Sequence, residues 1–184
     1  MKFGFPMAYV TTMLAWGGIT WTRGYDNAGQ TGYLKECIRW PVNYFIAAHT
    51  SKFEFVGQVI SDEGKRVCIG RYSISNDCYV FQVGDGEADH AYWGRPEDMT
   101  MARPAYSITA DGPGSDLAGE TAAALAASSI FYTNMAETNL AADCLQHAKD
   151  LFEFADTYRG VYTDTIPAGA YYKSVAVVFV AVQL

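Results

Sequence analysis

The sequence has no apolar run long enough to cross a lipid bilayer, and it has no excess of positive charge. Its 184 residues include 13 Lys and Arg against 20 Asp and Glu, which gives a formal net charge of −7 at pH 7. A membrane-spanning helix needs about 20 mainly apolar residues in succession, whereas nucleic acids and anionic membrane surfaces bind clustered Lys and Arg. The sequence therefore argues against nucleic acid or a membrane as a partner.

The sequence also lacks cysteines at the spacing of zinc ligands, so no metal site is expected from them. It has four cysteines, Cys37, Cys68, Cys78 and Cys144, and four cysteines can pair in three ways. Cys37 and Cys144 fall on the apolar faces of two expected helices, which favours buried free thiols at these two positions. The pairing of the four residues is left open.

The sequence is rich in apolar residues, which make up 50% of the chain, and in aromatic residues, which make up 15%. At this length, such a composition can form one domain with a sizeable core. Four segments have a helical pattern. In three of them apolar residues recur every three or four positions, and in the other alanine dominates, so the sequence predicts an all-α fold. The expected helices are 6–16, 33–49, 115–129 and 139–158, joined by a turn-rich loop at 22–32, an extended piece at 51–58 and a tyrosine-rich loop at 161–174.

Glycine and proline mark where these helices are expected to bend and end. Gly17 and Gly18 should end the first helix, Pro41 should kink or split the second, and Gly160 should end the fourth. The stripes expected to face the core are Met7, Val10, Met13 or Leu14 and Gly17 in the first helix, Leu34, Cys37, Ile38, Val42, Phe45 and Ile46 in the second, and Leu140, Cys144, Ala148, Leu151 and Ala155 in the fourth.

The most unusual stretch is ADHAYWGRPEDMTMARPAY at 88–106, where polar and aromatic residues are interspersed and two prolines prevent one long helix. Aromatic faces pack against the apolar faces of a sugar ring, while Arg, His and carboxylate groups supply the directional hydrogen bonds that hydroxyl groups require. The stretch is therefore typical of a sugar-binding loop. The alternative is a packed surface loop whose Arg and carboxylate groups pair with one another.

Carboxylates gather at two places in and beside this stretch, Asp85, Glu87 and Asp89 at one and Glu97 and Asp98 at the other. Two such groups could in principle act as acid and base, but the sequence shows no surroundings that would raise the pKa of one of them. The first cluster also lacks the spacing and the closing Glu of a helix-loop-helix calcium site. Neither chemistry is assigned to these residues.

Four stretches resemble, in the right order, the motifs of the family-nine glycoside hydrolases, the secreted endoglucanases of animals, plants and bacteria. They are KFGFPMA at 2–8, HAYWGRPEDMTMARPAY at 90–106, PGSDLAGETAAALAASSI at 113–130 and LFEFADTYRGVYTD at 151–164. The resemblance implies a partial (α/α)6 barrel of six helical hairpins, with less than half of the barrel in this chain. It also implies that the apolar stretch after Lys2 is an interior helix and not a signal peptide.

The resemblance further implies the activity of an endo-β-1,4-glucanase, or cellulase, that hydrolyses β-1,4-glucosidic bonds in cellulose or a cello-oligosaccharide with inversion. The parent enzyme would be extracellular. Inverting hydrolysis needs two carboxyl groups roughly 6.5–9.5 Å apart, so that a water molecule fits beside the base. In the family the base is an Asp of a D-A-G-D motif just before a segment like 2–8, and the acid is a Glu near the far C-terminus. Both catalytic groups are therefore expected outside this chain.

Three substrate-binding residues are implied by the match. His90 and Tyr172 correspond to a histidine and a tyrosine of the family's cleft, and Trp93 is a third candidate whose indole could equally lie in the core. The other two histidines, His49 and His147, match no family position of this kind, and a lone histidine is more often structural than a ligand.

Two segments depart from the family pattern. Residues 60–82 match nothing in the family and are interpreted as a lineage-specific loop or, preferably, as translated intron sequence, because long structureless loops inside compact domains are uncommon. Residues 175–184 form a non-family tail, and the family's calcium site would follow Ser174. No cofactor is therefore expected in this chain.

The chain as given is expected to be catalytically inactive, since it lacks both carboxyl groups. The alternative function is that of a non-catalytic carbohydrate-binding or regulatory fragment. A partial barrel also leaves apolar helix faces without their partners, which predicts poor solubility.

Overall fold

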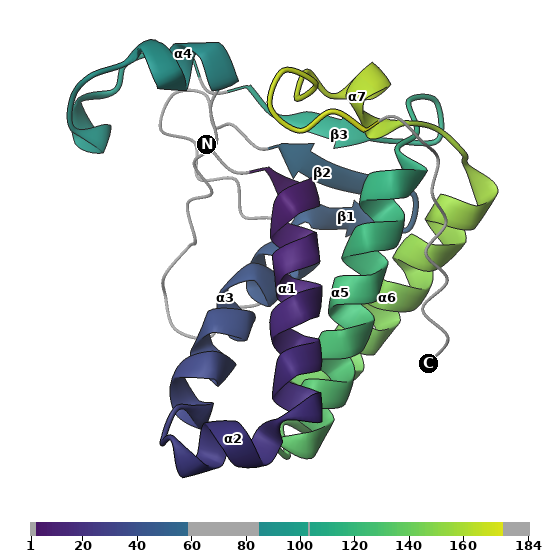
Figure 1. Ribbon diagram of the computed structural model, residues 1–184. Coiled ribbons are helices and arrows are strands. Elements are labelled where there is room, and N and C mark those ends of the chain that lie inside the picture. The colour runs from purple at the N-terminus through teal and green to yellow at the C-terminus, as the bar shows by residue number, and fades with distance from the viewer. Residues whose placement is uncertain (1–2, 59–84, 103, 175–184) are drawn as a thin grey trace.

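The computed structural model describes residues 3–58, 85–102 and 104–174, and these ranges form a helical body with a small sheet at one end (Figure 1). The helices are α1 (Gly4–Thr20), α2 (Thr22–Asn27), α3 (Thr31–Ala48), α4 (Gly86–Ala91), α5 (Ser115–Asn134), α6 (Thr138–Thr157) and α7 (Tyr162–Thr165). α1 packs against both α3 and α5, and α5 lies between α1 and α6. α2 joins α1 to α3 at one end of the body, while α4 and α7 lie at the opposite end.

The sheet has three antiparallel strands in the order β1 (His49–Ser51), β2 (Glu54–Gln58) and β3 (Tyr106–Ile108). The expected extended piece at 51–58 contains β2, and a turn at 52–53 separates β1 from β2. Phe55 pairs with Ile108 across β2 and β3, and both side chains are fully buried. The sheet thereby closes the core at the end where α4 and α7 lie.

α5 is the central helix of the core, because its alanines let neighbouring backbones approach closely. Ala118, Ala122 and Ala124 are buried, and α5 makes its main contacts with α1 and α6. The expected alanine-rich helix is thus confirmed. Large side chains fill the remaining space, and those that are almost fully buried include Tyr44, Phe45, Phe55, Phe131, Tyr132 and Phe154.

The buried face of α1 differs from the expected stripe. Val10 and Met13 are exposed, at 52% and 51%. The residues that α1 buries are Gly4, Ala8, Thr11, Ala15 and Gly18. A face of small residues matches the alanines of α5 and allows a short distance between the two helices. Of the expected stripe, Met7 and Leu14 are half-buried and pack against the core, whereas Val10 and Met13 lie on the outer side.

Gly17 and Gly18 do not end α1, which continues to Thr20. A Cβ atom on Gly18 would lie 2.6 Å from Cε2 of Phe131 and 2.9 Å from Cδ2 of Leu34. Glycine is therefore required at position 18 for close packing, not for a turn.

The stripes of α3 and α6 are confirmed except at Cys37 and Ile46, which is only half-buried. Buried positions are Leu34, Ile38, Val42 and Phe45 in α3 and Leu140, Cys144, Ala148, Leu151 and Ala155 in α6. Cys37 is exposed because it precedes Ile38 on the flank of the stripe, whereas Cys144 is buried, and both are free thiols. Burial raises the pKa of the Cys144 thiol to about 12, so it stays protonated. Cys68 and Cys78 lie outside the described residues.

Several expected boundaries change in the structure. α3 runs without interruption through Pro41, so the helix is not split. α6 ends at Thr157, before Gly160. The expected loops at 22–32 and 161–174 contain the short helices α2 and α7, and Tyr25 of α2 packs partly against the core. The segments 60–82 and 175–184 lie outside the described residues.

An ionic cluster fastens α3 to the junction of α5 and α6. Glu137, which precedes α6, forms ion pairs with Lys35 and Arg39 of α3. The hydroxyl of Tyr132 donates to the carbonyl of Lys35 at 3.0 Å, and the Arg39 guanidinium lies 5.6 Å from the centre of the Tyr132 ring. Burial raises the pKa of Glu137, but the hydrogen bonds from Lys35 and Arg39 outweigh it and leave that pKa below its ordinary value.

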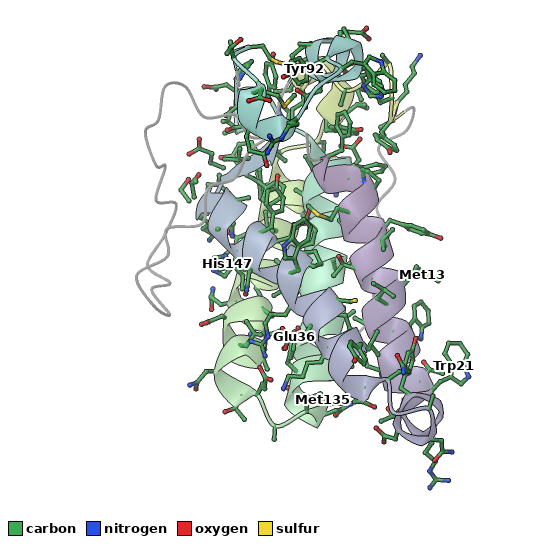
Figure 2. All side chains as sticks on the ribbon, turned by 90° about the vertical axis from the view of Figure 1, so that its left-hand side faces the viewer. Met13, Trp21, Glu36, Tyr92, Met135 and His147 are labelled. Carbon is green, nitrogen blue, oxygen red and sulfur yellow. The ribbon has the colours of Figure 1, made fainter. Side chains whose placement is uncertain are left out.

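A histidine pair joins the start of β1 to α6, where His147 lies beside α3 (Figure 2). The Nδ1 atoms of His49 and His147 are 2.8 Å apart. One of these nitrogens must carry a hydrogen and the other must be unprotonated for the bond to form. Burial lowers the pKa of both imidazoles, and His147 lowers that of His49 further. The two histidines that matched no family motif thus form a neutral hydrogen-bonded pair.

Candidate functional site

The site is built on α4, the first part of the polar and aromatic stretch. Asp85 caps the helix, since its Oδ1 accepts a hydrogen bond from the N–H of Ala88 at 3.0 Å. Glu87 accepts a hydrogen bond from the hydroxyl of Tyr171 at 3.0 Å. Two carboxylates of the first cluster therefore hold α4 in place. Within the described parts of the chain, no three His, Cys, Asp or Glu side chains are placed to hold a metal ion together.

His90 lies on the last turn of α4, and its ring is fixed at two points. Its Nδ1 is 2.8 Å from the carbonyl oxygen of Gly86, and the ring stacks on Tyr171 with centroids 4.9 Å apart and planes at 15°. Donation from Nδ1 to the carbonyl leaves Nε2 as the acceptor atom of the neutral ring. The side chain is exposed at the surface, so Nε2 can accept a hydrogen bond from a ligand hydroxyl.

Aromatic residues from both ends of the described chain gather beside His90. The ring of Phe3 lies 5.5 Å from that of Tyr171 and 5.1 Å from that of Tyr172, the second contact being edge to face. Tyr172 keeps 44% of its surface exposed. Phe3, His90, Tyr171 and Tyr172 are called the aromatic cluster below. It presents ring faces and edges together with directional polar atoms, which is the chemistry that a sugar requires.

The structure brings two of the three expected sugar-binding residues together. His90 and Tyr172 are both members of the aromatic cluster, whereas Trp93 follows α4 with its indole 97% exposed. Beyond Trp93, Arg95 and Glu97 form an ion pair of 3.6 Å next to a short 3-10 turn at Pro96–Asp98. This part of the stretch matches the alternative of a surface loop with internally paired charges.

Sequence reasoning missed Phe3 and Tyr171 as members of the site. Phe3 belongs to the KFGFPMA motif and Tyr171 directly precedes Tyr172, so both lay within segments that were already singled out. Their roles depend on contacts between residues far apart in the chain, and no local pattern encodes such contacts.

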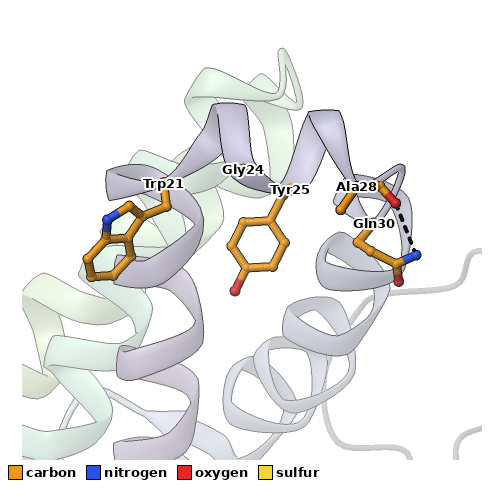
Figure 3. A pocket seen from close by; sticks show the side chains of 5 residues that line it. All are labelled: Trp21, Gly24, Tyr25, Ala28 and Gln30. Carbon is orange, nitrogen blue, oxygen red and sulfur yellow. Dashed lines mark hydrogen bonds between the residues drawn. The ribbon is translucent and has the colours of Figure 1, made fainter.

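A hollow lies around α2, at the end of the helical body opposite the aromatic cluster (Figure 3). It has a volume of about 240 Å³ and is lined by Trp21, Gly24, Tyr25, Ala28 and Gln30. The amide of Gln30 donates to the carbonyl of Ala28 at 3.4 Å. The side chains that line it are uncharged, and their hydrogen-bonding groups are the indole N–H of Trp21, the hydroxyl of Tyr25 and the amide of Gln30.

A family model described as glycosyl hydrolase family 9 matches residues 1–179. The chain belongs to glycosyl hydrolase family 9. Its membership confirms the expected enzyme class, that of glycoside hydrolases.

Relatives within family 9 are much longer than this chain. Endoglucanase B of Cellulomonas fimi is 48% identical over 175 residues, which cover 95% of this chain and 14% of that protein. Endoglucanase 22 of Oryza sativa subsp. japonica is 43% identical over 177 residues, which cover 96% of this chain and 27% of that protein. The chain therefore spans well under half the length of these relatives.

Solved family-9 structures confirm the expected fold. An endoglucanase from the termite Nasutitermes takasagoensis is 48% identical, with a TM-score of 0.80 over 96% of this chain and 35% of that one. A cellulase of C. cellulolyticum in complex with cellobiose is 30% identical, with a TM-score of 0.70 over 87% of this chain and 32% of that one. The chain is mainly helical and forms part of the family's (α/α)6 barrel, with three short strands at one end.

Among the described helices of this family-9 chain, none combines the length and the apolar character needed to cross a membrane. The assignment of His90, Trp93 and Tyr172 to substrate binding stays a prediction from the family motif.

Proposed function

We propose that this chain is part of an endo-β-1,4-glucanase that hydrolyses β-1,4-glucosidic bonds of cellulose with inversion. Family membership supports the proposal, as do the relatives named endoglucanases and the solved cellulase that holds cellobiose. The observation that carries it in this molecule is the aromatic cluster, where His90 stacks on Tyr171 and Phe3 packs on Tyr172. An extracellular location of the parent enzyme is part of the same proposal.

The proposed role of the aromatic cluster is to hold the sugar chain. The exposed ring of Tyr172 supplies an apolar surface for a glucose ring, and Nε2 of His90 accepts a hydrogen bond from a sugar hydroxyl. Trp93, with its exposed indole, supplies a second stacking surface. Because aromatic stacking and hydrogen bonds act together, removal of either should weaken binding.

The proposed role of the 184-residue chain by itself is binding without hydrolysis. The base and the acid are expected in the parts of the family domain that flank this chain, and inversion requires both carboxyl groups on opposite sides of the bond. Of the local carboxylates, Asp85 accepts a hydrogen bond from the N–H of Ala88 and Glu87 accepts one from the hydroxyl of Tyr171.

Hydrolysis and binding should be measured on the same preparation of the chain. We expect no release of reducing ends from soluble cellulose, together with measurable affinity for cellotetraose by calorimetry. Release of reducing ends that is lost on substitution of a carboxylate in this chain would contradict the proposed inactivity.

Matched substitutions locate the binding site. Trp93→Ala and His90→Ala should each weaken cellotetraose binding, by roughly two- to thirtyfold for loss of about 0.5–2 kcal/mol of stacking or hydrogen bonding. Trp21→Ala removes another exposed indole, beside the hollow at α2, and should leave the affinity unchanged. Weaker binding in Trp21→Ala alone would move the sugar site to α2 and refute the assignment to the aromatic cluster.

A further inference from the structure

The turn that carries Tyr171 and Tyr172 is bonded both to itself and to α7. The N–H groups of these two tyrosines donate to the carbonyl of Ala168, at 3.0 and 2.9 Å. The carbonyl of Tyr172 in turn accepts a hydrogen bond from the hydroxyl of Tyr162. The first two bonds shape the turn, whereas the third connects it to the body of the protein.

Tyr162 is itself fixed through both its ring and its backbone. Its side chain is 2% exposed, and the ring stacks on Phe5 of α1 with centroids 5.1 Å apart and planes at 23°. Its N–H donates to Oδ1 of Asp116 at 2.9 Å, and the same oxygen accepts from the N–H of Leu117 at 2.9 Å. Asp116 is 6% exposed in the first turn of α5. The central helix α5 therefore determines where the Tyr162 hydroxyl lies.

The Tyr162 hydroxyl is suited to act as a permanent donor. Burial, and after it the carboxylate of Asp116, raises the pKa of Tyr162 to about 12. The hydroxyl therefore keeps its proton at pH values near neutrality. Phe3 contacts the Tyr172 ring from the side of α1, so ring and carbonyl of Tyr172 are held by separate elements.

We propose that Asp116 and Tyr162 are positioning residues, which hold the backbone of Tyr172 so that its ring is correctly placed to stack on a glucan. The proposal rests on the proposed sugar-binding function of the aromatic cluster. Neither residue touches the sugar. They hold the turn in its bound conformation before the sugar arrives. The turn then loses less conformational entropy on binding, and the affinity is higher.

The decisive variant is Tyr162→Phe, which removes the hydroxyl and keeps the ring on Phe5. Its matched control is Tyr132→Phe, because Tyr132 is also fully buried and its hydroxyl also donates to a backbone carbonyl, that of Lys35. Both variants should lower the melting temperature to a similar extent. A purely structural role for Tyr162 predicts no further difference between them.

Two readouts separate positioning from general stability. In Tyr162→Phe, amide hydrogen exchange measured by mass spectrometry should rise in the peptide that covers 168–174, and cellotetraose affinity should fall about two- to tenfold, as expected for loss of one neutral hydrogen bond. In Tyr132→Phe, exchange in that peptide and cellotetraose affinity should both equal those of the unaltered chain.

Asp116 is tested by a pair of substitutions. Asp116→Asn retains an Oδ1 that can accept from Tyr162 and Leu117, and among the described residues Oδ2 has no hydrogen-bond partner to lose. Asp116→Ala removes the acceptor. We expect exchange at 168–174 to rise in Asp116→Ala and to return toward the unaltered value in Asp116→Asn.

Failure of this proposal can be told apart from failure of the proposed function. If the unaltered chain binds cellotetraose and Tyr162→Phe binds it equally well, the positioning role is overturned while the sugar site stands. If exchange at 168–174 is unchanged in Tyr162→Phe, the positioning role is overturned whatever the sugar result. If exchange rises in Tyr162→Phe but the unaltered chain binds no cellotetraose, the support of the turn by Tyr162 is upheld and the proposed sugar-binding function is refuted.

Discussion

Gly86 is a point of close approach between α4 and the aromatic cluster. A Cβ atom at this position would lie 2.4 Å from Cε2 of Tyr171, which is well inside van der Waals contact. The carbonyl of the same glycine receives the Nδ1 hydrogen bond of His90. The absence of a side chain at Gly86 leaves room for the Tyr171 ring that stacks on His90, and the Gly86 carbonyl accepts the hydrogen bond that orients the His90 ring.

Gly86→Ala should therefore disrupt the stacking of His90 on Tyr171. Helix propensity alone would favour alanine by about 1 kcal/mol, but overpacking of this kind typically costs about 1–3 kcal/mol. We expect a lower melting temperature and a downfield shift of the His90 ring protons in the NMR spectrum as the Tyr171 ring moves away.

The control for this substitution is Gly24→Ala in α2. A Cβ atom there would meet its nearest neighbour, Cβ of Trp21, at 4.0 Å, so alanine should be neutral or stabilising. If Gly86→Ala leaves both the melting temperature and the His90 shifts unaltered, the close approach does not orient the ring.

At the scale of residues, family motifs predicted His90 and Tyr172, but the stacking partner of His90 could not be predicted. Tyr171 reaches His90 from a turn near the end of the described chain, and a contact of that kind depends on the path of the backbone. Trp93 shows the converse limit, since its exposed indole has the right chemistry but lies apart from the cluster's ring contacts.

Among the secondary-structure elements, the histidine pair is the connection between β1 and α6 that responds to pH. Both imidazoles are neutral in the folded protein, because burial lowers the pKa of each, and the carboxylates of Asp143 and Asp150 compensate only in part. The Nε2 atom of His49 also lies 3.5 Å from the carbonyl oxygen of Lys52. One further proton on the neutral pair would remove the acceptor and break the bond between the two rings.

We therefore expect the chain to lose stability as the pH falls below about 6.5, the ordinary histidine pKa. Below this pH the two histidines of the unfolded chain bind protons, whereas those of the folded pair do not. The loss of folding stability therefore grows until the pH reaches the lowered pKa values of His49 and His147 in the folded protein. Each pKa unit of difference corresponds to about 1.4 kcal/mol per histidine. Denaturant melts at a series of pH values between about 7.5 and 5.5 measure the effect.

Substitution assigns this pH dependence to the pair. His147→Leu should be less stable near neutrality but should flatten the dependence, whereas His90→Ala should retain it because His90 is exposed. A dependence that persists unchanged in His147→Leu would show that other groups cause it.

The same contrast between local pattern and tertiary context explains which elements could be predicted. α3 and α6 carry large apolar residues on one face, so periodicity predicted their positions and most of their buried residues. α1 is apolar on all sides and buries its small residues, because the neighbouring α5 is lined with alanine. Periodicity cannot choose between a face of large residues and a face of small ones without knowledge of the neighbouring helix.

For the whole molecule, the outer side of α1 is the clearest consequence of an incomplete barrel. Tyr9, Val10, Met13 and Trp16 are each more than half exposed. Figure 2 shows Met13 and, at the end of the helix, Trp21 at the margin of the molecule. An apolar surface of this kind in water favours self-association.

We expect the chain to elute from size-exclusion columns as concentration-dependent oligomers. Trp16→Glu should raise the monomer fraction, because a charge on the exposed face opposes association. Gln146→Glu adds the same charge at an exposed position of α6 and should have little effect. A sharp monomer peak of the unaltered chain with a cooperative melt would contradict the expectation.

The pairing of β2 with β3 has a consequence for how this chain can change in length. Gln58 and Tyr106 are partners in the sheet, so the chain leaves β2 and enters β3 at neighbouring points. Doubling the length of such an excursion costs only about 0.6 kcal/mol of closure entropy. Sequence inserted between these two residues, outside α4 and its contacts with Tyr171, should therefore cost the helical body little, and this is where evolution, or a protein engineer, can add length.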